Sequence, residues 1–173
     1  MSKKINLLET GNMLLAAQKI VLCCHVSPDG DTLGSALGLA RLLEQKGKEV
    51  TVFVDDDINK SLNFVPGIEK VQRPEASVTI EADLFVVVDA SSFDRVGICN
   101  EVVKAPVLLN IDHHISNTEF ADYLYLDAEA AAAGEIMCDL FEAMGWEYDE
   151  AIAIDFYTAI TTDCGSFRYS NTT

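Results

Sequence analysis

The sequence predicts an α/β fold in which a mainly parallel sheet carries helices on both faces. Segments with helical apolar spacing alternate along the chain with short, nearly continuous apolar runs. Such runs are typical of parallel strands that are buried on both faces. The chain has 173 residues, which suffices for one domain with a substantial core, so we expect a single domain over residues 1–173.

The position of each element follows from apolar spacing and helix-stop residues. Helices are expected at residues 7–18, 31–45, 130–144 and 150–162, with glycine stops at positions 47 and 145. Strands are expected at residues 20–25, 49–54, 84–89, 107–112 and 123–126, with a turn-rich piece at 62–67 and a brief edge strand at 68–72. Gly30, Gly34 and Gly38 form a stripe of small residues, which we expect to let their helix approach the sheet.

Composition and charge narrow the classes of function. The formal net charge of −16 argues against binding of long duplex nucleic acid, which needs a basic surface. No apolar run reaches the ~20 residues of a membrane span and the chain does not start like a signal peptide, so we expect no membrane contact and a cytoplasmic location. Five cysteines without a Cys-x-x-Cys pair favour reduced thiols. Monomer and homodimer both stay open.

Acidic and histidine side chains follow three of the predicted strands. His25, Asp29 and Asp31 come after the first, Asp89 ends another, and Asp112-His113-His114 ends a third. In an open parallel sheet, ligand sites lie just beyond the carboxyl ends of the strands. Imidazole nitrogens and carboxylate oxygens gathered there suit Mn, Fe, Zn or Mg. The absence of a thiolate cluster argues against a structural zinc site.

Each of these segments alone has a simpler explanation. Asp29 or Asp31 can cap the helix that follows, and Asp89 can be another cap. A carboxylate that ends five apolar residues is nevertheless costly to bury unless it is paired or bound to a metal. Asp163, placed just after the last predicted helix, adds a fourth segment. Only a shared metal site explains all four segments together, so we favour it.

Four motifs in this order resemble those of the DHH phosphoesterase family. The segments concerned are His25-x-x-Pro28-Asp29-Gly30-Asp31, Val88-Asp89, Asp112-His113-His114 and Thr162-Asp163-Cys164-Gly165-Ser166-Phe167. They extend over nearly the whole chain. The first is most similar to the motif of small bacterial oligoribonucleases that also act as 3′,5′-bisphosphate nucleotide phosphatases. The resemblance therefore implies a metal-dependent hydrolase.

The resemblance also implies a role for each motif residue. One metal ion would be held by His25, Asp29 and Asp89, and a second by Asp31, Asp89, His113 and Asp163. Asp89 would bridge the two ions, which in this family are usually manganese. His114 would face the scissile phosphate with Asp112 as its partner, and both are the catalytic candidates. Arg168, with Thr172 or Thr173, would contact substrate, and a surface ion pair for Arg168 fits equally well.

The function so implied is two-metal hydrolysis of a phosphate ester. The expected partner is a short RNA or a nucleotide: the enzyme would release 5′-mononucleotides from short oligoribonucleotides, remove the 3′-phosphate of 3′-phosphoadenosine 5′-phosphate, or do both. Three alternatives stay open. They are hydrolysis of cyclic di-AMP or linear diadenylate, hydrolysis of inorganic pyrophosphate, and metal or nucleotide binding without catalysis.

Three features depart from the family's pattern. Cys164 stands where threonine is common, and residues 130–133 are all alanine where the family often carries serine or threonine. The Gly-rich, His-containing motif of a second, DHHA1-type substrate-binding domain has no counterpart in these 173 residues. We therefore expect an isolated catalytic domain that turns over oligonucleotides weakly, because remote binding energy normally helps to position the reacting group.

Overall fold

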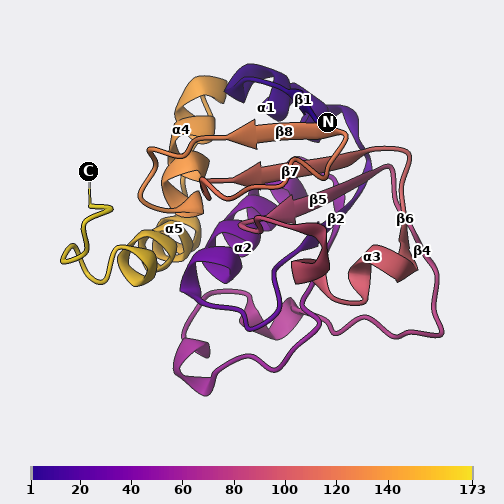
Figure 1. Ribbon diagram of the computed structural model, residues 1–173, viewed down its shortest axis with the longest axis horizontal. Helices are drawn as coiled ribbons and strands as arrows, with labels where there is room; N and C mark the ends of the chain where they lie inside the picture. Colours follow the sequence, from indigo (N-terminus) through magenta and orange to yellow (C-terminus); the bar gives the residue numbers. More distant parts are fainter. Residues whose placement is uncertain (1, 173) are drawn as a thin grey trace.

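A six-stranded sheet, parallel at every pairing, forms the centre of the computed structural model, which describes residues 2–172 (Figure 1). Its strand order is β1-β8-β7-β5-β2-β3. The strands are β1 (Lys3–Lys4), β2 (Lys19–Cys23), β3 (Glu49–Phe53), β5 (Leu84–Val88), β7 (Leu108–Asp112) and β8 (Tyr123–Leu126). The predicted α/β class and mainly parallel sheet are therefore confirmed.

Both faces of the sheet are covered, but unevenly. Four longer helices pack with alternate strand residues into the larger apolar cluster: α1 (Leu7–Ala16), α2 (Gly30–Gln45), α4 (Ala133–Met144) and α5 (Glu150–Asp163). The other face is covered by the 3₁₀ turn Phe93–Val96, the short α3 (Cys99–Val102) and the two-stranded sheet of β4 (Ile80–Glu81) and β6 (Val103–Lys104). No helix within residues 2–172 is both long and apolar enough to cross a membrane.

Two of the expected elements differ from the structure. Residues 68–72 do not form an edge strand: Ile68–Lys70 is a 3₁₀ helix behind Gly67, which has a left-handed φ of 83°, and Gln72 makes only an isolated bridge to Phe53. Helix α4 begins at Ala133 rather than at residue 130, because Ala132 is extended, with φ −162° and ψ 159°. The short β1, β4, α3 and β6 segments were not predicted.

The glycine stripe of α2 faces α5, not the sheet. A Cβ atom on Gly34 would collide with the carbonyl oxygen of Asp155, one on Gly38 with the Phe156 ring, and one on Gly30 with Thr162. The expectation that this stripe lets α2 approach the sheet is therefore wrong: the stripe lets α2 approach α5. Contacts in this order make α2 and α5 antiparallel, so the first turn of α2 lies beside the last turn of α5.

Candidate metal centre

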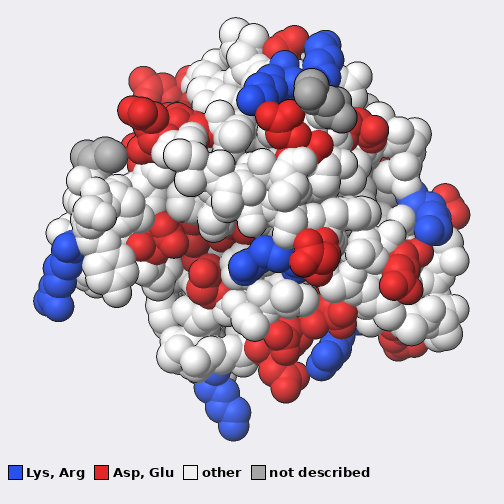
Figure 2. All heavy atoms as spheres, viewed as in Figure 1, with Lys and Arg blue, Asp and Glu red and all other residues white. Residues whose placement is uncertain are grey.

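The carboxyl ends of three neighbouring strands and the facing ends of two helices bring the predicted metal ligands together. His25 follows β2, Asp89 follows β5, and His113 follows β7. Asp29 and Asp31 begin α2, and Asp163 is the last residue of α5. Figure 2 shows acidic side chains gathered where the strand ends meet α5.

One group of ligand atoms consists of His25, Asp29 and Asp89. The Nε2 atom of His25 lies 3.4 Å from Asp89 Oδ2 and 3.7 Å from Asp29 Oδ1. Asp29 is also the N-cap of α2, where its Oδ1 accepts hydrogen bonds from the backbone N–H groups of Asp31 and Thr32. The capping and metal-binding explanations of this carboxylate are therefore compatible.

A second group consists of Asp31, His113 and Asp163, again with Asp89 alongside. The Nε2 atom of His113 lies 3.4 Å from Asp89 Oδ1, 3.7 Å from Asp31 Oδ2 and 3.9 Å from Asp163 Oδ2. The two oxygens of Asp89 thus face different imidazoles, His25 on one side and His113 on the other.

The spacing of these atoms suits a shared divalent cation better than direct hydrogen bonds between the side chains. Two ligand atoms that each lie ~2.1 Å from one cation are roughly 3–4 Å apart, as here. Asp89 Oδ1 and His113 Nε2 are buried and have no hydrogen-bond partner among the described residues, and such an unsatisfied atom costs about 1–3 kcal/mol. Asp89 also holds a left-handed backbone with φ 59°. Non-glycine residues adopt this conformation at a cost, often at functional sites.

The electrostatics of the centre show how strongly it attracts positive charge. Burial lowers the pKa of His25, but the nearby carboxylates of Asp29 and Asp89 outweigh burial and raise the pKa to about 10. His113 behaves alike: burial is outweighed by Asp89 and Asp31, and the pKa rises to about 9. Burial and the charge of Asp89 raise the pKa of Asp31 well above its usual range. The same negative field favours a divalent cation.

His114 is held differently from the other two histidines. Its Nδ1 atom donates to Asp112 Oδ1 at 2.7 Å, and this hydrogen bond is the main cause of the raised His114 pKa. Asp112 is fully buried, and its other oxygen accepts from Asn117 Nδ2 at 2.6 Å. Asn117 in turn donates to Asn110 Oδ1 at 2.7 Å. Since Asp112 occupies Nδ1, the Nε2 atom of His114 is left for another partner.

Several residues near these groups were missed by the sequence analysis. Asn117 and Asn110 fix Asp112, Thr32 Oγ1 donates to the Val88 carbonyl just before Asp89, and Arg95 Nη2 lies 3.0 Å from His25 Nδ1. Asn110 did carry a signal, because it is a polar residue inside an apolar strand. The others lie in loops or a helix without a distinctive pattern.

Of the residues predicted to contact substrate at the carboxyl end of the chain, those that the structure describes are exposed. Arg168 is exposed and makes no ion pair with any of residues 2–172. Thr172 is exposed as well, and Thr173 lies outside the described residues. Cys164 is buried, and its sulfur accepts a hydrogen bond from the Phe167 N–H at 3.3 Å.

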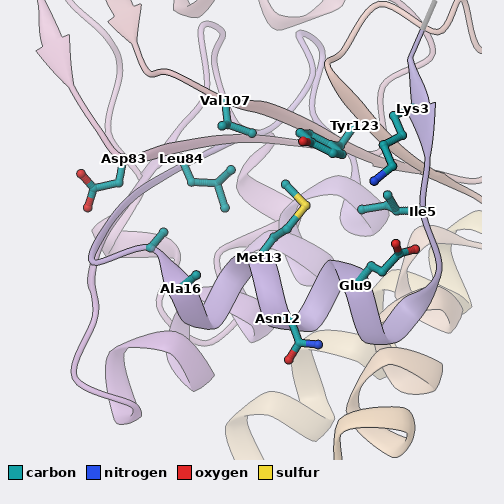
Figure 3. A pocket seen from close by; sticks show the side chains of 11 residues that line it. Lys3, Ile5, Glu9, Asn12, Met13, Ala16, Asp83, Leu84, Val107 and Tyr123 are labelled. Atoms are coloured by element: carbon teal, nitrogen blue, oxygen red, sulfur yellow. The ribbon is translucent and has the colours of Figure 1, made fainter.

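A cavity of about 550 Å³ lies at the opposite end of the sheet. Figure 3 shows Met13 of α1 pointing toward Leu84, Val107 and Tyr123, at the amino ends of the strands. Its Asp83 side chain already has local partners, because it accepts hydrogen bonds from the backbone N–H groups of residues 18 and 19. This cavity is separate from the candidate metal centre.

Several known proteins are similar to this chain over most of its length. The bifunctional oligoribonuclease and PAP phosphatase NrnA of Thermus thermophilus is 37% identical over 157 residues, which cover 89% of this chain and 46% of that protein. A probable manganese-dependent inorganic pyrophosphatase of Listeria welshimeri is 26% identical over 152 residues, covering 87% and 49%. An exopolyphosphatase-related protein from Bacteroides fragilis superposes with a TM-score of 0.88 at 28% identity, covering 96% of this chain and 52% of that one.

The chain spans about half the length of the curated relatives it matches. Residues 19–167 match the model of the DHH family, N-terminal domain. All the candidate metal ligands, together with Asp112 and His114, lie inside this range. The chain therefore belongs to the DHH family.

Proposed function

We propose that this protein is a two-metal phosphoesterase that acts on short oligoribonucleotides and on 3′-phosphoadenosine 5′-phosphate. The observation that carries the proposal is the position of Asp89, whose two oxygens face His25 and His113 at 3.4 Å each. One carboxylate between two groups of ligands is suited to bridge two cations. The similarity to the Thermus enzyme supports the choice of substrate.

The ligands assigned to each cation follow from the two groups of side chains. His25, Asp29 and Asp89 would hold one, while Asp31, His113 and Asp163, together with Asp89, would hold the other. Two divalent cations, in our proposal manganese, would activate a water molecule and neutralise charge on the phosphoryl group. Their hard oxygen and imidazole ligands suit manganese.

The side chain of His114 would act on the substrate rather than on a metal. Its Nδ1 atom is taken by Asp112, and the side chain is 37% exposed, so Nε2 can reach a phosphate at the surface of the centre. A protonated imidazole there would donate a hydrogen bond to a phosphate oxygen. Asp112 keeps its charge, because hydrogen bonds from His114 and Asn117 hold its pKa low despite burial.

Hydrolysis of inorganic pyrophosphate is the second candidate function, favoured by the similarity to the Listeria protein. The same centre would serve both reactions, since each cleaves a bond to phosphorus.

A manganese-dependent hydrolysis panel tests the proposal. It compares a diribonucleotide, 3′-phosphoadenosine 5′-phosphate, cyclic di-AMP, pyrophosphate and bis(p-nitrophenyl) phosphate, using the wild type with and without EDTA and the isosteric variant Asp89→Asn. We expect the first two substrates to be hydrolysed fastest, and Asp89→Asn to be inactive. Turnover of pyrophosphate alone would favour the second candidate. Equal turnover by Asp89→Asn, or none by the wild type on any substrate, would overturn the proposal.

A further inference from the structure

All three ligands of the second group are tied to one short segment of the chain, residues 130–134: Asp31 and His113 directly, and Asp163 through Asn171. This segment connects β8 to the first turn of α4. The N–H of Ala133 donates to Asp31 Oδ2 at 2.7 Å, and the N–H of Gly134 donates to Asp31 Oδ1 at 2.9 Å. Both oxygens of this buried carboxylate are thereby fixed by the backbone of another helix.

His113 is held by the same segment. Its Nδ1 atom lies 3.2 Å from the carbonyl oxygen of Ala130. When Nδ1 carries the proton and donates it to that carbonyl, Nε2 keeps its lone pair and faces the carboxylates. A hydrogen bond of this kind fixes the tautomer and the ring orientation of a metal-binding histidine.

Asp163 is tied to the segment through Asn171. The Nδ2 atom of Asn171 donates to Asp163 Oδ2 at 3.1 Å and to the carbonyl oxygen of Ala131 at 2.9 Å. A side-chain amide has two N–H hydrogens, enough for both acceptors. The chain returns to this position because residues 165–167 all have a left-handed φ, between 56° and 64°, which turns it back after α5.

The segment supplies these contacts with main-chain atoms only. Ala132, the N-cap of α4, has no side chain that can cap the helix, and Asp31 accepts the free N–H groups in its place. The first group of ligands depends on other parts of the chain: in the described residues, no hydrogen bond of His25, Asp29 or Asp89 reaches residues 130–134. Apart from the N–H of Asp31, which donates to Asp29 Oδ1, the two groups therefore depend on different hydrogen bonds.

We propose that residues 130–134 and Asn171 form a positioning platform for one cation of the pair, the one assigned to Asp31, His113 and Asp163. Asn171 is a positioning residue: it touches neither substrate nor cation, and holds Asp163 against the platform. The alanines at 130–133 meet this need because their N–H and C=O groups, not their side chains, orient the ligands. This inference rests on the proposed two-metal centre.

Two variants test the platform by removing two different contacts. Asn171→Ala removes the tie to Asp163, with Ser170→Ala as its control, because Ser170 is an exposed neighbour in the same segment. Ala133→Pro removes the N–H that binds Asp31. Proline is well tolerated at the first position of a helix and after an extended residue such as Ala132. Glu150→Pro, at the first position of α5 after the extended Asp149, is the matched control.

The measurement is Mn²⁺ binding to protein freed of metal by EDTA, followed by calorimetric titration and by electron paramagnetic resonance of the ion pair. For the wild type and both controls we expect two ions per chain. For Asn171→Ala and Ala133→Pro we expect one site unchanged and the other weakened about 10–100-fold, with loss of the spin-coupled signal at limiting Mn²⁺. A wild type that binds fewer than two ions would contradict the two-metal proposal itself. Two wild-type sites that both variants leave unchanged, or weaken equally, would overturn the platform.

Discussion

The Nδ1 atom of His114 lies 2.7 Å from Oδ1 of Asp112, closer than to any other carboxylate it faces. The distance from the same Nδ1 atom to Asp89 Oδ1 is 3.6 Å. The buried Asp112 therefore determines which edge of the ring points outward, and distinguishes His114 from the adjacent His113, whose Nε2 atom faces the carboxylates. Two histidines in sequence thus have different partners.

His114→Ala is expected to keep its bound manganese and to lose about 10²–10⁴-fold in turnover, the range typical of a positioned proton donor or acceptor. Elemental analysis and hydrolysis of a diribonucleotide measure the two effects on the same sample. Asp112→Asn should cost less, about 10–100-fold, because the ring stays in place with a weaker partner. Loss of a metal ion from His114→Ala would make His114 a ligand and contradict its assignment.

Asp89→Asn is expected to weaken both cation sites, since each oxygen of Asp89 faces a different histidine at 3.4 Å. His25→Ala should weaken mainly one site, because His25 faces only the first group of carboxylates. Metal counting after dialysis against micromolar manganese distinguishes the two variants. Retention of two ions per chain by Asp89→Asn would show that this carboxylate is not the bridge.

Asp155→Asn is expected to change how stability depends on pH. Asp155 is fully buried between α2 and α5, and burial raises its pKa to about 7, although Arg41, 3.9 Å away, acts in the opposite direction. Below pH ~4 the carboxyl is protonated in both folded and unfolded chains, so it does not lower the free energy of unfolding. As the pH rises toward 7 the unfolded chain ionises first, so the free energy of unfolding falls, by up to ~4 kcal/mol at pH 8.

The variant without this carboxyl should therefore gain stability relative to the wild type between pH 5 and pH 8. Urea denaturation at both values gives the difference, with Glu75→Gln as a control at an exposed carboxyl. A stability difference between Asp155→Asn and the wild type that does not change with pH would show that Asp155 is already ionised in the folded protein at pH 5.

Gly34→Ala should destabilise the protein by about 1–3 kcal/mol, because the new methyl group meets the Asp155 carbonyl oxygen, a backbone atom that cannot move without shifting α5. Gly11→Ala is the matched control within α1. The atoms nearest to its methyl group belong to the flexible Met144 side chain, and it gains the same helix propensity, so we expect little net change. Thermal denaturation compares the two. Equal effects would mean that α2 and α5 can separate at little cost.

The sequence predicted correctly those features of the fold and of the site that depend on residue type. Buried strands had to be apolar, and the charged or imidazole side chains that ended them had to converge, because parallel strands end at one edge of a sheet. Asp89 and His113 were identified in this way. Residues 68–72 were predicted wrongly because a short apolar pattern with Ile68 and Val71 fits a strand and a 3₁₀ turn equally well.

What the sequence could not indicate are contacts made by main-chain atoms. The carbonyls of Ala130 and Ala131 and the N–H of Ala133 bind the ligands or their supports, but any residue carries these groups. The alanines at 130–133 were therefore interpreted as a departure from the family's serine or threonine, and their support of the metal ligands was not predicted. Asn171 was overlooked for a related reason, since its role depends on a backbone turn after α5 that brings it back to Asp163.

The carboxylate of Asp31 lies in the first turn of α2 and also at the amino end of α4. The positive ends of two helix dipoles therefore meet at one buried carboxyl group. The hydroxyl of Ser35 adds a third hydrogen bond to this carboxylate, donated to Oδ1 at 3.2 Å. The centre is thus pre-organised. A cation would bind to a rigid cradle and order no loop there, so the ordering entropy has already been spent in folding.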